Sequence, residues 1–135
     1  MPARYEMSTS VKGVFAEVKA RVVEALKTQG FGVLTEIDVQ NTLKEKLGLE
    51  MEPYIILGAC NPQLAHQALD SDRSIGLLLP CNVVLRSEDG DVRVSILDPQ
   101  KMFEVTDTQT QADLAGLPEE ARKRLQAALH RLGDR

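Results

Sequence analysis

The chain has 135 residues, of which 43% are hydrophobic and 27% charged, and a formal net charge of −4. This composition is typical of a soluble globular protein, and we expect a single domain over residues 1–135. The acidic charge argues against binding to nucleic acid, and no apolar run approaches the ~18–20 residues of a membrane span. Since the first ten residues, MPARYEMSTS, lack the apolar core of a secretory signal, we expect a cytoplasmic protein without membrane partners.

The first third of the chain predicts a strand, a helix and a second strand. Residues 4–9 alternate loosely between polar and apolar types, which indicates a strand. Apolar residues then recur every three or four positions over residues 13–29, which predicts a helix with Ser10 as its N-cap and Gly30 after its end. Residues 31–38 alternate again and predict a strand that is buried mainly on one face.

The middle of the chain holds the longest apolar runs. Asp38 is a suitable N-cap for a short helix that Gly48 ends. Residues 54–60 are apolar at almost every position, which is typical of an internal strand. Asn61 followed by Pro62 is a strong helix start, and we expect this helix to reach about residue 69.

The last third of the chain predicts a hairpin and a closing helix. Asp89-Gly90 favours a type I′ turn between strands over residues 81–87 and 91–97. Residues 106–114 predict a brief helix, and residues 118–132 carry a clear apolar stripe. The sum is an α+β fold in which helices cover one face of a mostly antiparallel sheet. The other face is solvated or covered by a partner subunit. Leu34, and the strand over residues 54–60 that is apolar on both faces, favour a covered face and therefore a homodimer.

Both cysteines lie where an apolar run meets a proline, and an asparagine follows each of them, as Cys60-Asn61 and Cys81-Asn82. If their strands are antiparallel neighbours, the two cysteines lie at the same end of the sheet; a parallel crossover would separate them. Cys60 precedes a helix start, where unpaired amides lower a thiol pKa. Burial as apolar filler explains each cysteine as well as thiol chemistry does, because no C-x-x-C motif is present.

Other side chains that could carry chemistry have simpler structural interpretations. His66 and His130 lie on polar helix faces, so we expect no metal site. Asp98 ends a strand before a proline, which is typical of a turn, although it remains a candidate binding residue beside Cys60, Asn61, Cys81 and Asn82. No nucleophile elbow, phosphate loop or dinucleotide motif is present, so neither a catalytic residue nor a cofactor is predicted.

The order of several motifs resembles that of a known family. The segments LGACNP, IGLLLPCNVVL and VSILDP follow one another as in the domain of unknown function 302 family. The resemblance spans nearly the whole chain and implies a β-α-β(4)-α arrangement like that of the TATA-binding-protein fold, and a dimer. It also implies that the two cysteine-bearing strands are antiparallel. It brings no established activity, and likeness to a DNA-binding fold is not evidence of DNA binding.

Two hypotheses follow from these residues. The first is a homodimeric, non-enzymatic module that binds a small ligand or a partner at the sheet face or at the cysteine end. The second is a thiol-dependent redox or sensor protein, in which Cys60 is the reactive thiolate and Cys81 resolves the mixed disulfide. Their discriminating feature is the reactivity of the two thiols in the native protein.

Overall fold

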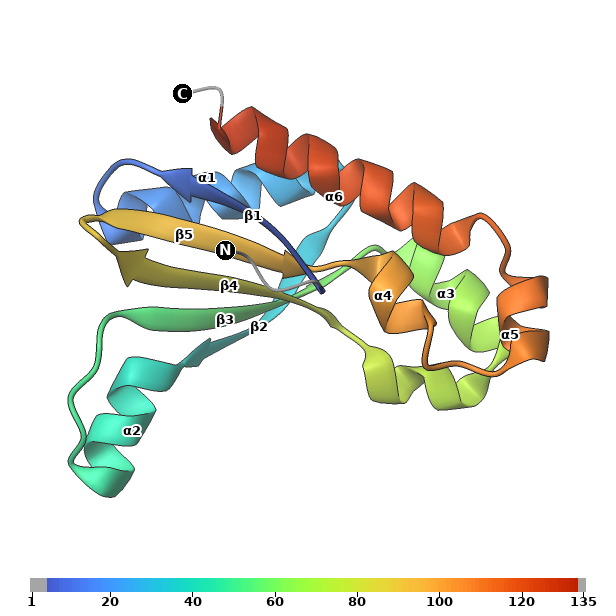
Figure 1. Ribbon diagram of the computed structural model, residues 1–135, viewed down its shortest axis with the longest axis horizontal. Helices are drawn as coiled ribbons and strands as arrows, with labels where there is room; N and C mark the ends of the chain where they lie inside the picture. Colours follow the sequence, from blue (N-terminus) through green and yellow to red (C-terminus); the bar gives the residue numbers. More distant parts are fainter. Residues whose placement is uncertain (1–4, 134–135) are drawn as a thin grey trace.

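A computed structural model describes residues 5–133 and shows an α+β fold with five antiparallel strands in the order β1-β5-β4-β3-β2 (Figure 1). This arrangement confirms the predicted fold class. The strands are β1 (Glu6–Val11), β2 (Gly32–Asp38), β3 (Tyr54–Cys60), β4 (Cys81–Glu88) and β5 (Asp91–Leu97). The helices are α1 (Phe15–Thr28), α2 (Val39–Leu47), α3 (Pro62–Ser71), α4 (Pro99–Phe103), α5 (Thr108–Asp113) and α6 (Leu117–Gly133), with a 3₁₀ helix, η1 (Arg73–Leu78), between α3 and β4.

Two long helices, α1 and α6, cover one face of the sheet. They are apolar on one side, and this side packs on every second residue of the strands, because side chains alternate between the faces of a sheet. The main core therefore lies between the sheet and this helix pair. Its completely buried large side chains include Val18, Val22, Leu26, Leu57, Val83, Leu85, Val94, Ile96 and Leu125.

A second, smaller apolar cluster lies beyond the end of the sheet where β3 ends and β4 begins. It is built from α3, η1, α4 and the segment that leads from α5 into α6. A hydrogen bond of 3.1 Å from the Thr110 hydroxyl to the Asp72 carboxylate ties α5 to the start of η1. The buried members of this cluster are Ala68, Ile75, Phe103 and Leu114.

The second strand is much more exposed than its sequence predicts. β2 is an edge strand, and its register with β3 shifts between Val33 and Thr35, so that Leu34 lies outside the regular pairing. None of its seven residues, all of them described, is buried. The predicted burial on one face holds only at the start of the segment, where Phe31 is buried and Val33 packs partly on the core. Beyond the bulge, Thr35 and Ile37 are exposed, because the edge strand leaves the helix-covered part of the sheet there.

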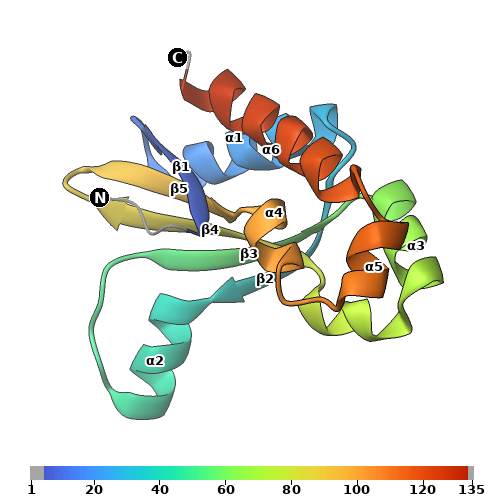
Figure 2. The same ribbon diagram turned by 45° about the vertical axis from the view of Figure 1, so that its right-hand side comes forward.

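Helix α2 projects away from the sheet on the side opposite α1 and α6 (Figure 2). Asp38 caps it as predicted, accepting a 2.9 Å hydrogen bond from the Asn41 amide, and Gly48 ends it with a φ of 67°. No residue of α2 is buried, although the structure describes the whole helix. An amphipathic helix of nine residues without a packed face has little intrinsic stability.

Most other predicted elements agree with the structure to within a few residues. Asp89 and Gly90 have φ values of 53° and 84°, as the type I′ turn between β4 and β5 requires. Ser10 is not an N-cap, because β1 extends to Val11 and α1 begins after Val14. The predicted first strand began at residue 4, which lies outside the described residues. Among residues 5–133, no helix is both long and apolar enough to cross a bilayer.

Candidate functional site

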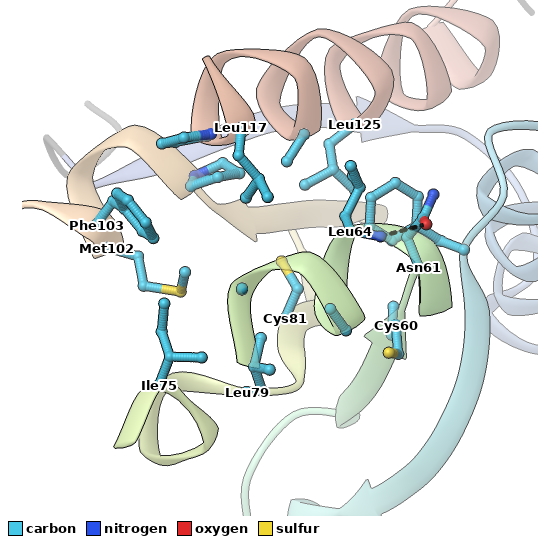
Figure 3. Close-up of a pocket in the computed structure, with 17 residues that line it drawn as sticks. Cys60, Asn61, Leu64, Ile75, Leu79, Cys81, Met102, Phe103, Leu117 and Leu125 are labelled. Carbon is cyan, nitrogen blue, oxygen red and sulfur yellow. Dashed lines mark hydrogen bonds between the residues drawn. The ribbon is translucent and has the colours of Figure 1, made fainter. Parts of the chain in front are cut away.

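A cavity of about 70 Å³ lies at the junction of the two apolar clusters, beneath the end of β3 and the start of β4 (Figure 3). It is partly open to solvent, and its walls come from the sheet end, α3, η1, α4 and α6. Almost all of the wall is hydrocarbon, with the Cys81 thiol and the Asn61 side chain as exceptions. The lining residues are Phe31, Ala59, Cys60, Asn61, Leu64, Ala65, Ala68, Ile75, Leu79, Cys81, Pro99, Met102, Phe103, Leu117, Pro118, Ala121 and Leu125.

The Cys81 thiol points into this cavity from the first residue of β4 (Figure 3). Cys81 pairs with Ala59 in the sheet, so its side chain lies on the helix-covered face beside that buried alanine. Burial raises the pKa of the Cys81 thiol from its ordinary value of 9.0 to about 12. The thiol therefore stays protonated at physiological pH and acts as a weakly polar part of the wall.

The Cys60 thiol lies on the other face of the sheet. Cys60 follows Ala59 in β3 and pairs with Gly32, and successive side chains of a strand point to opposite faces. Figure 3 shows its sulfur directed away from Asn61 and Leu64, so only the rest of the residue contributes to the cavity wall. Burial raises its pKa above the ordinary value. The expected lowering by the helix start is therefore wrong, because the thiol points away from that helix.

This geometry removes the support for a redox pair. The antiparallel register brings both cysteines to the same end of the sheet, as expected, but their side chains project from opposite faces. Both cysteines lie within the described residues 5–133, and neither forms a disulfide. With both pKa values raised, neither cysteine has the thiolate character that thiol exchange requires.

Asn61 joins the helix α3 to the cavity. Its Oδ1 accepts a 3.1 Å hydrogen bond from the Leu64 amide, which confirms the predicted N-cap, and Pro62 occupies the first turn (Figure 3). Only 6% of the residue is exposed, and within residues 5–133 its Nδ2 donates to no partner. Among residues 5–133 the only fully buried side-chain nitrogen or oxygen without a partner is Arg93 Nε, so the Asn61 Nδ2 keeps access to solvent. Asn61 therefore gives the apolar wall one polar edge.

The two remaining candidate residues lie outside the cavity. Asn82 is exposed on the open face of the sheet. Together with Tyr54 and Arg86 it lines a shallow depression of about 290 Å³. Asp98 is buried and has a structural role: its Oδ1 accepts from the Gln100 amide at 2.9 Å, and its Oδ2 pairs with Arg122 Nε at 3.2 Å. The predicted turn at Asp98 is thus the N-cap of α4.

The two histidines are exposed on their helices, as predicted. In residues 5–133, no group of three or more His, Cys, Asp or Glu side chains is placed to hold a metal ion.

Several cavity residues escaped prediction because they are distant in the sequence. Met102 and Phe103 line the cavity without having been singled out in the sequence, and Ala121 and Leu125 lie within the apolar stripe predicted for residues 118–132. Their meeting with Cys81 depends on how α4 and α6 cross the end of the sheet. The available signal for a wall at this end was the pair of apolar residues Met102 and Phe103 in the short segment that follows β5.

Comparison with known proteins agrees with this fold. Residues 7–132 match the model of the family described as Domain of unknown function DUF302. The chain is also similar to the crystal structure of an uncharacterized conserved DUF302 protein from Bacillus stearothermophilus, with 32% sequence identity and a TM-score of 0.84, over 96% of this chain and 99% of that one. No curated protein gives a match. With a family match over residues 7–132 and a structural relative of the same description, the chain belongs to the DUF302 family.

Proposed function

We propose that the protein is a binding module for a small apolar ligand, which it holds in the cavity beneath Cys81. The cavity itself supports this proposal most directly, because it is a preformed hollow, partly open to solvent, whose wall is almost entirely apolar. Its wall comes from segments between residues 31 and 125, so the fold assembles it from nearly the whole chain. Preformed, mostly apolar hollows with a few polar groups are the usual form of small-molecule sites.

The wall chemistry favours binding over catalysis. The Cys81 thiol is protonated and therefore a poor nucleophile. The Asn61 carboxamide is neither an acid nor a base. No charged side chain lines the cavity. Such a site offers dispersion contacts and one amide donor, which suffice to hold a small molecule but do not supply an acid, a base or a nucleophile.

Xenon is a suitable first probe, because an apolar cavity of about 150 Å³ binds xenon or benzene and this one is about half as large. Under xenon pressure, we expect NMR shift changes at the methyl groups of Ala59, Ala68 and Leu125. Ala68→Leu adds three carbons to the cavity wall and should abolish these changes. Ala127→Leu, on an exposed position of α6, should preserve them. Unchanged spectra for the wild-type protein would contradict the proposal.

We further propose that the module is a homodimer. Leu34 and Leu47 are 68% and 65% exposed, and Ile37 and Leu49 next to them are also exposed. These residues belong to β2 and to the segment around α2, which lie away from the core (Figure 2). A second copy that covers this surface would give α2 the packed face it lacks in one chain. Light scattering after size-exclusion chromatography should give twice the chain mass.

A further inference from the structure

We propose that residues 62–80, which contain α3 and η1, form a hinged lid over the cavity, and that a hydrogen bond between Asp72 and Thr110 holds this lid closed. The inference rests on the proposed binding function, because it assigns the route by which a ligand reaches the cavity. We call this segment the lid and the hydrogen bond the latch.

The lid leaves the sheet and returns to it at neighbouring positions. β3 ends at Cys60 and β4 begins at Cys81, and Cys81 pairs with Ala59 across the two strands. Leu64, in the first turn of α3, and Cys81 both pack against the main core next to these positions. The two ends of the lid are therefore fixed side by side, so the lid can turn about them while the sheet stays intact.

Beyond this hinge, the lid packs on the smaller apolar cluster. Ala68 and Ile75 are its buried residues there, and they meet Phe103 and Leu114 from the other side of the cluster. The cavity lies within the same contact: Figure 3 shows Ile75 and Leu79 on the opposite side of the cavity from Leu117. Because a void removes dispersion contacts across it, separating the lid from α4 and α6 costs less than opening the main core.

The outer side of the lid is exposed to solvent. Its outward side chains include those of Gln63, His66, Gln67, Asp70 and Arg73, and all of these residues are exposed. An outward movement of the lid therefore meets no other element in the part of the chain that the structure describes.

Polar contacts fasten the far end of the lid to α5. Asp72 lies between α3 and η1, where its Oδ1 accepts a 3.0 Å hydrogen bond from the Ser74 amide and its Oδ2 accepts a 3.1 Å hydrogen bond from the Thr110 hydroxyl. Thr110 is only 4% exposed, so the latch is shielded from water. An exposed and longer contact, 3.5 Å from Ser71 Oγ to Asp113 Oδ2, lies beside it. The latch joins the lid to α5 at the end opposite the hinge, so it must break before the lid opens.

The Cys81 thiol reports the opening of the lid, because it points into the cavity (Figure 3). N-ethylmaleimide serves as the reagent. A cavity of about 150 Å³ holds the six carbons of benzene, so this larger molecule does not fit into 70 Å³ and alkylates Cys81 only after the lid has moved. Peptide mass spectrometry measures the labelling rates of the two cysteines separately.

Thr110→Val removes the hydroxyl of the latch and keeps the size of the buried side chain. It should raise the rate of Cys81 labelling about fivefold, which is the effect of losing one ordinary hydrogen bond. Thr28→Val is the matched control, because the Thr28 hydroxyl donates to the Ala25 carbonyl at 2.6 Å within α1, and it should leave the rate unchanged. The Cys60 thiol lies on the other face of the sheet, so its labelling rate should stay the same in both variants.

Hydrogen exchange provides a second measurement. The amides of α3 and η1 should exchange faster than those of β4 in the wild-type protein, and Thr110→Val should accelerate only the former. Lid amides that exchange together with those of β4 would overturn the proposal. So would a Cys81 labelling rate that Thr110→Val leaves unchanged, or an equal rise at Cys60, which would indicate loosening of the whole fold.

Both measurements use the protein without a cavity ligand, so they test the lid separately from the proposed function. Failure of xenon to bind would overturn the proposed function even if the lid opens as expected, whereas a lid that does not open would leave xenon binding as the test of the cavity.

Discussion

At the scale of single residues, the environment of the two cysteines decides what their thiols can do. Cys81 sits opposite Ala59 on the buried face of the sheet, and Cys60 is one residue further along β3 on the other face. Cys81 is paired with the residue before Cys60, so the two cysteine side chains point to opposite faces and the sheet lies between their sulfur atoms. Desolvation dominates both thiols and disfavours the charged form. A raised pKa keeps both thiols in the neutral form at neutral pH, so Cys81 contributes an uncharged group to the cavity wall.

The raised pKa of Cys81 predicts a loss of stability at alkaline pH. Below pH 9 the thiol is protonated in the folded and unfolded chain alike. Between pH 9 and about 12, only the unfolded chain releases this proton, so the free energy of unfolding falls by about 1.4 kcal/mol per pH unit. From pH 9 to 10.5, the wild-type protein should therefore lose about 2 kcal/mol relative to Cys81→Ala, measured by urea unfolding under reducing conditions.

The comparison with Cys81→Ala isolates this thiol, because Lys and Tyr side chains titrate in both proteins and cancel in the difference. Cys81→Ala also enlarges the cavity and lowers stability at neutral pH, but that cost does not depend on pH. A stability difference that stays constant from pH 7.5 to 10.5 would show that the thiol is not desolvated in the folded protein.

At the scale of elements, the cavity exists because α4 turns back at the end of β5 and meets α6. Asp98 controls this turn, since one carboxylate oxygen caps α4 and the other binds Arg122 of α6. The ion pair is unevenly exposed: the Asp98 side chain is 12% exposed and that of Arg122 is 42%. A carboxylate this buried depends on both partners for compensation.

Asp98→Asn should destabilise the protein by about 1–3 kcal/mol, because the cap oxygen remains while an amide replaces the oxygen that binds Arg122. Urea unfolding at pH 7 measures this change. Asp107→Asn is the matched control, since Asp107 caps α5 through the Thr110 amide at 2.9 Å and is exposed. If both variants lost equal stability, the pair with Arg122 would contribute nothing beyond capping.

The elements differ in how far their sequences determine them. Local signals sufficed for α2, α3 and the β4–β5 turn, because Asp38, Asn61 and Asp89-Gly90 act through their own backbone. The exposure of β2 was not predictable from alternation, since it depends on an edge position and a bulge. The opposite orientation of Cys60 and Cys81 could not be predicted without the strand register, because it depends on which residues of β3 and β4 are paired. The cavity likewise depends on the packing of α4 and α6 against the end of the sheet.

At the scale of the whole molecule, apolar side chains are buried in some elements and exposed in others. The helix-covered face and the cavity end bury their apolar side chains, whereas β2 and α2 leave theirs exposed. Scattered single leucines are common on protein surfaces, but here Leu34 and Ile37 of β2 are exposed together with Leu47 at the end of α2 and Leu49 just after it. We propose that these side chains belong to one interface. A stable interface buries about 800 Å² on each partner, so the adjoining open face of the sheet would have to take part in it.

Leu47→Lys should convert the proposed dimer to a monomer, because it places a charge in the apolar patch of α2, where burial would leave the charge unpaired. Sedimentation velocity at micromolar concentrations measures the change. Leu77→Lys is the matched control: Leu77 is 89% exposed on η1, far from α2, and its substitution should leave the mass unchanged. A wild-type protein that sediments as a monomer at high concentration would contradict the dimer. If Leu47→Lys and Leu77→Lys both dissociated the dimer, the interface would not be located on α2.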